Sequence, residues 1–216
     1  MTLLRIGQQI CILPLYFKYP LFKTDLSFLK CYAFSNPYKI CRAYFLQYEN
    51  KNVFYGDTWP FSVPHFVRLL NLGKEDVFYD IGSGTSRISF WFQIISGCRV
   101  KAIEKVPFFI QKAQQIQQKL NNNKIEILQA DLLDIDYSDA THIYFYASSF
   151  DDQIILSLIA KWKNLKVGTQ IITTSFSLKE YGAFEYEIVN QYKVSYPWGT
   201  CTLFLNKKVE PSFKMK

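Results

Sequence analysis

Three acidic residues follow three successive apolar segments of the chain, at positions from which they can bind one ligand. Asp80 lies in VFYDIGSGTS, Glu104 ends CRVKAIE, and Asp131 follows KIEILQA. Helix-like segments separate these runs, so each reads as a buried strand of a parallel sheet. Ligands of such sheets sit beyond the carboxyl ends of the strands. The spacing therefore predicts three carboxylates around one crevice.

The loop after Asp80 carries two glycines, Gly82 and Gly84, on either side of Ser83. Glycines let the chain turn tightly and let a ligand touch the backbone. In a dinucleotide site this loop would hold phosphates at a helix N-terminus. An acid before the glycines opposes an anion, and Arg87 replaces the third glycine of G-x-G-x-x-G. The loop favours a ligand with an ammonium group and no phosphate, such as S-adenosylmethionine.

The two later acids suit the other parts of that ligand. Glu104 can accept both ribose hydroxyls, a feature that NAD sites share, and Lys105 follows it directly. Asp131 is placed to accept the adenine amino group, with Leu132 against the ring. Two further acids within the next five residues are alternatives for the role of Asp131.

Helix-like and strand-like segments alternate from residue 61 onward, which predicts an α/β, Rossmann-like, doubly wound and mostly parallel sheet. The expected strands lie within 76–82, 98–104, 124–131, 141–147 and 168–176, and the expected helices within 61–73, 86–95, 107–120 and 151–163. Gly73 is expected to end the first of these helices. The segments 184–196 and 200–208 predict an antiparallel terminal hairpin.

Residues 1–52 are expected to form an aromatic-rich helical arm that precedes a domain over 53–216. Apolar residues recur at helical spacing around 26–33 and again over 40–46, where Asn36 or Ser35 can cap the helix and Pro37 can open it. The aromatic side chains of the arm are expected to pack in the core.

Residues 54–206 resemble the class I, seven-β-strand, S-adenosylmethionine-dependent methyltransferases on the strength of these acids, the glycine loop and the hairpin. The segment VFYGDTWPF is also similar to histone-lysine methyltransferases without a SET domain. The segments DYSDATHIYFY and YPWGTCTLFL resemble the seven-strand lysine methyltransferases related to the mitochondrial ones. That resemblance implies that Tyr55, Gly56, Asp57 and Thr58 cap the methionine end of the cofactor. It also suggests a bacterial version of these enzymes.

The end of the fourth strand should face the methyl acceptor. Its sequence, YFYASSF, lacks the prolines of the N-P-P-Y motif with which amino-methylating enzymes grip a flipped base, so base methylation is disfavoured. Tyr146 and Ser148 are the candidate catalytic residues, with Ser149 beside them, and Tyr146 also borders the cofactor. Trp198 can cover the entrance or pack in the core.

Composition narrows the remaining classes. Five cysteines without a C-x-x-C pair and two histidines argue against a disulfide framework or a metal site and fit a reducing cytoplasm. No run of about 20 apolar residues predicts a membrane span. The net charge of +7 keeps nucleic acid possible as a partner. We expect a protein-lysine methyltransferase; the alternatives are an RNA or small-molecule methyltransferase and a cofactor-binding module without catalysis.

Overall fold

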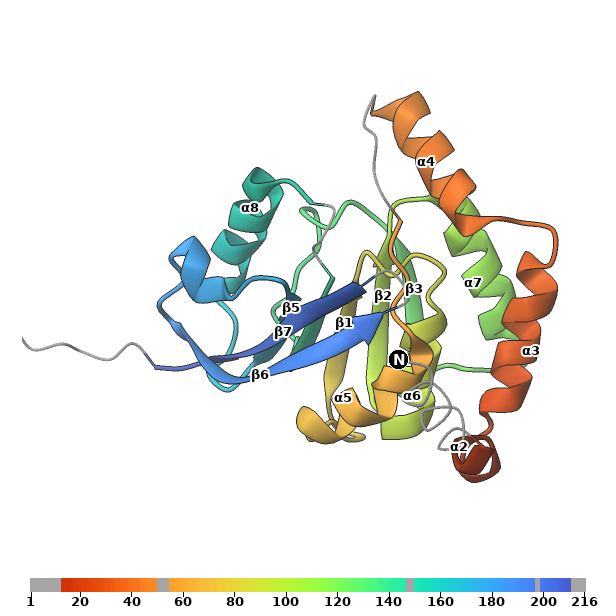
Figure 1. Cartoon of the computed structure of the whole chain (residues 1–216), viewed down its shortest axis with the longest axis horizontal. Coiled ribbons are helices and arrows are strands. Elements are labelled where there is room, and N and C mark those ends of the chain that lie inside the picture. The colour runs from red at the N-terminus through yellow and green to blue at the C-terminus, as the bar shows by residue number, and fades with distance from the viewer. Residues whose placement is uncertain (1–12, 50–54, 147–149, 197–198, 211–216) are drawn as a thin grey trace, which may run out of the picture.

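The computed structural model describes residues 13–49, 55–146, 150–196 and 199–210. A seven-stranded sheet runs through it in the order β3-β2-β1-β4-β5-β7-β6 (Figure 1). The strands are β1 (Val77–Ile81), β2 (Arg99–Glu104), β3 (Ile125–Gln129), β4 (His142–Phe145), β5 (Gln170–Thr174), β6 (Tyr186–Tyr196) and β7 (Gly199–Lys208). The helices are α2 (Leu13–Lys18), α3 (Leu21–Tyr32), α4 (Pro37–Tyr48), α5 (Val63–Leu69), α6 (Arg87–Ser96), α7 (Pro107–Leu120) and α8 (Asp152–Trp162), with 3-10 turns η1 (Pro60–Ser62) and η2 (Leu178–Tyr181).

The sheet topology confirms the predicted fold class. Strands β1 to β5 pair in parallel, whereas β7 pairs antiparallel with both β5 and β6. The strand order changes direction between β1 and β4. In doubly wound sheets this switch point opens a crevice at the carboxyl ends of the strands.

Both faces of the sheet are buried, which explains why its strands are continuous apolar runs. Phe78 of β1 packs in one core cluster with α5, α6 and α7. Its neighbours Val77 and Tyr79 pack in a second cluster with α8. Alternate side chains of each central strand thus meet different helices.

The prediction that Gly73 ends the first helix of the domain is wrong. Helix α5 ends at Leu69, and Asn71 takes the left-handed turn with φ of 50°. The amide of Leu72 then donates to the carbonyl of Val67 at 3.0 Å. Asparagine tolerates this backbone conformation, so it closes the helix where glycine was expected.

The described part of the arm, residues 13–49, forms the helices α2, α3 and α4, of which α3 packs against α6 and α7 (Figure 1). As predicted, the Asn36 side chain caps α4, accepting from the amides of Tyr38 and Lys39. Phe28 is buried against Phe90 of α6, with ring centroids 5.4 Å apart. None of the described helices is long and apolar enough to cross a bilayer.

The expectation that the aromatic side chains of the arm lie in the core is only partly correct. Phe28 is 5% exposed, but Phe17, Phe22 and Phe34 are 85%, 63% and 104% exposed. The inward face of α3 instead includes the small polar residues Thr24 and Ser27, which allow the arm to approach the domain closely.

Asp25 of α3 joins the arm to the domain by accepting three hydrogen bonds. Its carboxylate accepts from the Arg87 guanidinium at 2.9 Å, from the Trp91 indole at 3.0 Å and from the Tyr16 hydroxyl. The Asp25 side chain is 13% exposed. Hydrogen bonds of this kind, to a buried charged acceptor, are among the stronger ones in proteins.

We therefore expect Asp25→Ala to lower the free energy of unfolding by about 2–3 kcal/mol, because it leaves buried donors unsatisfied. Urea denaturation measures this loss. Asp152→Ala is the matched control: Asp152 also accepts a hydroxyl hydrogen bond, from Tyr181, but the pair is exposed. Equal losses in the two variants would show that the Asp25 junction does not hold the arm in place.

Candidate functional site

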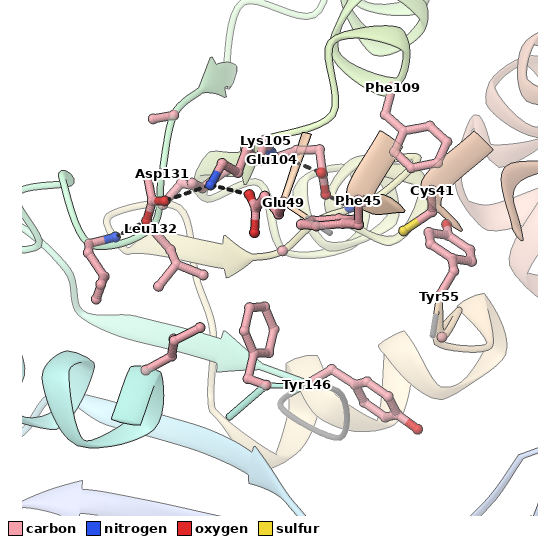
Figure 2. A pocket seen from close by; sticks show the side chains of 18 of the residues that line it. Cys41, Phe45, Glu49, Tyr55, Glu104, Lys105, Phe109, Asp131, Leu132 and Tyr146 are labelled. Atoms are coloured by element: carbon pink, nitrogen blue, oxygen red, sulfur yellow. Dashed lines mark hydrogen bonds and ion pairs between the residues drawn. The ribbon is translucent and has the colours of Figure 1, made fainter. Parts of the chain in front are cut away.

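A cavity of about 510 Å³ opens at the carboxyl ends of β1 to β4 (Figure 2). This volume lies within the range that small-molecule ligands occupy. Nine of the predicted cofactor residues line it: Tyr55, Gly56, Gly82, Gly84, Glu104, Lys105, Asp131, Leu132 and Tyr146. The fold thus brings together residues that are up to 91 positions apart, from Tyr55 to Tyr146.

The glycine loop forms one wall of the cavity. Gly82 is required by its positive φ alone, whereas Gly84 is required by its positive φ and by lack of space. Gly82 has φ of 71°, and a Cβ atom there would meet Phe150 only at ordinary contact distance. Gly84 has φ of 54°, and its Cβ would lie 2.7 Å from the ring of Tyr55. The Tyr55 hydroxyl also accepts a hydrogen bond from the amide of Thr85 at 3.3 Å. Tyr55 therefore covers the loop closely, and no side chain fits at Gly84.

Glu104 lies at the base of the cavity, where its carboxylate accepts three backbone hydrogen bonds. The amides of Gly84, Lys105 and Val106 each donate to it at 2.8 Å. Burial raises the pKa of Glu104, and these three hydrogen bonds act in the opposite direction. The carboxylate is thus fixed in position, with one side facing the cavity.

Asp80 lies behind the glycine loop and is not among the residues that line the cavity. Its side chain is 2% exposed and accepts a hydrogen bond from the Ser89 hydroxyl. Burial raises the pKa of Asp80 to about 7, and the nearby carboxylates of Glu104 and Asp57 add to the rise. Asp80 can therefore act on a ligand through its charge rather than by a direct contact.

Three more predicted residues lie outside the cavity lining. Asp57 borders a second cavity, of about 560 Å³, between the arm and Arg87; burial raises the pKa of Asp57 to about 6, against the effect of Arg87. The Thr58 hydroxyl forms a buried hydrogen bond of 2.7 Å with Tyr144. The Ser83 hydroxyl bonds to that of a neighbouring serine within the loop.

Lys105 connects two carboxylates at the edge of the cavity. Its ammonium lies 2.5 Å from the carboxylate of Glu49 and 3.0 Å from that of Asp131 (Figure 2). The hydrogen bonds to these acids raise the pKa of Lys105, so it is charged at neutral pH. Asp131 also accepts from the amide of Leu133 at 2.9 Å.

Sequence reasoning missed the contribution of the arm to this cavity. Cys41, Phe45 and Glu49 line it from α4 and its C-cap. Their spacing of four residues places them on one helix face, which the sequence does show. Nothing in that spacing indicates which part of the domain the face covers. Phe109, Leu133, Phe150 and Ile154 also line the cavity and were not predicted.

Tyr146 is the one predicted catalytic residue within the described part of the chain. It lines the cavity at the end of β4, and a Cβ at Gly56 would lie 3.0 Å from its ring. In Figure 2 its hydroxyl points away from the group formed by Glu49, Lys105 and Asp131. Ser148, Ser149 and Trp198 lie outside the described residues.

No family model matches the chain. It is 29% identical over 150 residues to a histone-lysine N-methyltransferase, H3 lysine-79 specific, from Caenorhabditis elegans, a match that covers 62% of this chain and 15% of that protein. It is 23% identical over 175 residues to the Dictyostelium discoideum protein of the same name, a match that covers 68% of this chain and 10% of that protein. The chain thus spans a small part of the length of these relatives.

Solved structures share the fold at low sequence identity. An RNA methyltransferase from Salinibacter ruber, crystallised with S-adenosyl-L-homocysteine, superposes with a TM-score of 0.59 at 22% identity over 74% of this chain and 99% of its own. TrmN from Thermus thermophilus superposes with a TM-score of 0.57 at 14% identity, over 71% of this chain and 50% of its own. The mitomycin 7-O-methyltransferase MmcR superposes with a TM-score of 0.54 at 11% identity, over 68% of this chain and 54% of its own.

These similarities agree with the strand order and the terminal hairpin. The chain has the fold of the class I S-adenosylmethionine-dependent methyltransferases.

Proposed function

We propose that this protein binds S-adenosylmethionine in the cavity at the ends of β1 to β4 and transfers its methyl group to a lysine amine of a protein. The observation that carries the proposal is geometric: the fixed Glu104 carboxylate and the glycine loop line this cavity, and Asp80 lies buried behind the loop. The pKa values of both carboxyl groups are raised by burial. Within the described residues, no cationic side chain forms an ion pair with Asp80 or Glu104. Such a site favours a cationic ligand.

The cavity suits the remaining parts of that cofactor. Glu104 has a fixed carboxylate that can accept ribose hydroxyls, and Leu132 offers an apolar surface to a base. Asp131 can accept the amino group of adenine. The neutral glycine backbone and the acid behind it suit the amino-acid end better than a phosphate.

When bound, S-adenosylmethionine supplies a methyl group on a sulfonium to the lone pair of an acceptor. The work of the protein is then mainly to hold the two partners in line. We assign Tyr146, at the edge of the cavity, to orienting the acceptor amine. A lysine must arrive neutral to react, and the aromatic wall of Tyr55, Phe150 and Tyr146 disfavours its ammonium form by desolvation.

Two comparisons point to different acceptors. Both sequence relatives are named as histone-lysine methyltransferases. The structural neighbour with a TM-score of 0.59 is an RNA methyltransferase. The sequence matches and the absence of an N-P-P-Y motif after β4 favour the lysine acceptor, and RNA is the second candidate.

The acceptor can be identified by incubating the protein with methyl-tritiated S-adenosylmethionine and native lysate. We expect label in protease-sensitive material and, after acid hydrolysis, in methylated lysine. Label that ribonuclease removes would replace the lysine acceptor by RNA. Binding of the cofactor without any transfer would favour the non-catalytic module. Heat-denatured protein is the control.

Cofactor affinity should depend on pH through Asp57 and Asp80, whose pKa values are about 6 and about 7. A bound cation stabilises the ionised carboxylates, so binding releases protons and tightens as the pH rises. We expect the Kd of S-adenosylmethionine to increase about tenfold or more from pH 7.5 to pH 5.5. Calorimetry in this window keeps the amine of the ligand, with a pKa of about 8, mostly protonated. A flat profile would contradict a role for these acids.

Asp80→Asn should weaken cofactor binding about tenfold while the ligand-free protein becomes more stable at pH 7.5. The sign follows from the raised pKa: the folded state disfavours the ionised carboxyl, so Asp80 destabilises the fold increasingly from about pH 4 to about pH 7, and this destabilisation is fully present at pH 7.5. Removing the charge should add about 1–2 kcal/mol to the free energy of unfolding.

The matched control for this variant is Asp139→Asn. Asp139 accepts from Tyr79 and Lys101, away from the cavity. We expect this variant to lose stability and keep its cofactor affinity. Lower stability with unchanged affinity in Asp80→Asn would make Asp80 a structural residue.

A further inference from the structure

The group of Glu49, Lys105 and Asp131 joins the arm to the predicted base-binding edge of the cavity. Glu49 is the C-cap residue of α4 in the arm, whereas Asp131 follows β3 in the sheet. Lys105 lies between them and is 39% exposed, so its ammonium can move toward either acid. The three groups carry a net charge of −1 when all are ionised.

Each oxygen of the Asp131 carboxylate already accepts one hydrogen bond. Its Oδ1 atom accepts from the amide of Leu133 at 2.9 Å, and its Oδ2 atom accepts from Lys105 at 3.0 Å. An amino group that donates to Oδ2 would share that oxygen with the ammonium. Two donors that converge on one oxygen repel each other unless the ammonium has another anion to approach.

Glu49 supplies that second anion, and packing fixes its position. Cys41, eight residues before Glu49 on the same face of α4, is 5% exposed and packs with Val106 and Phe109 at the start of α7. Phe45 joins the same cluster and lines the cavity. The arm therefore holds the Glu49 carboxylate beside Lys105 through apolar contacts that do not involve the charge itself.

We propose that Glu49 is a positioning residue that sets the base preference of the cofactor site by drawing the Lys105 ammonium away from Asp131. With Lys105 on Glu49, Asp131 presents an acceptor, which suits the 6-amino group of adenine. Without Glu49, Lys105 stays on Asp131 and presents an N–H donor, which suits a 6-oxo group instead. This inference rests on the proposed binding of S-adenosylmethionine.

The test compares two ligands that differ only at the N1–C6 edge of the base. S-adenosylhomocysteine carries the 6-amino group, and S-inosylhomocysteine carries a 6-oxo group in its place. Calorimetry on the full chain gives both Kd values and their ratio. We expect the wild-type protein to prefer the adenosyl ligand, and Glu49→Gln to reduce that preference about 3- to 10-fold, since half-exposed ion pairs have modest effects.

Phe45→Leu is the matched control on the same helix. It weakens the apolar contact of α4 without changing any charge, so both ligands should lose affinity by the same factor and their ratio should stay constant. Hydrogen exchange of the α4 amides in ligand-free protein should be equal in Glu49→Gln and wild type, because apolar contacts hold the helix.

The outcomes separate the two proposals. If wild-type protein binds neither ligand, the proposed function fails and this inference fails with it. If the adenosyl ligand binds and Glu49→Gln leaves the ratio unchanged, only the role of Glu49 is overturned. An equal shift of the ratio of the two Kd values in Phe45→Leu also overturns the role of Glu49, because the arm would then act by its packing alone.

Discussion

The carboxylate of Glu104 accepts hydrogen bonds from two separate loops, and the geometry of the cavity depends on them. The amide of Gly84 comes from the loop after β1, and those of Lys105 and Val106 come from the turn after β2. One side chain thereby sets the distance between two strand ends. The glycine loop and the start of α7 are both tied to this junction.

Because the Glu104 carboxyl holds the two loops together, an ionisable group lies in a buried site. Asp80 is a second buried carboxyl nearby. Burial raises both pKa values, and repulsion by Glu104 adds to the rise at Asp80, so the ligand-free site destabilises the fold at neutral pH. A ligand that carries positive charge reverses this effect. The same charges that weaken the free protein are then the source of binding energy, which is a common relation between stability and function at binding sites.

Much of the domain could be predicted because its signals are local. Buried parallel strands are short apolar runs, and the acids at their ends mark the crevice. The contribution of the arm to the cavity was harder to predict. The sequence shows that Cys41, Phe45 and Glu49 share a helix face, but tertiary packing decides what that face covers. Asp57 and Asp80 were expected in the cavity itself, but the pleat of β1 and the path before α5 turn them behind its wall.

The charges of the molecule act over two ranges, and this bears on how an acceptor is chosen. The chain as a whole carries +7, which favours approach of a polyanion over distances up to about 8 Å at physiological salt. Inside the cavity, acids outnumber cations: Glu49, Glu104, Asp131 and Asp151 line it together with Lys105. A phosphate is therefore attracted to the surface and repelled by the cavity, whereas a cationic group is attracted to the acidic lining of the cavity. The long-range field acts on macromolecules that approach the surface, and the short-range field acts on the groups that enter the cavity.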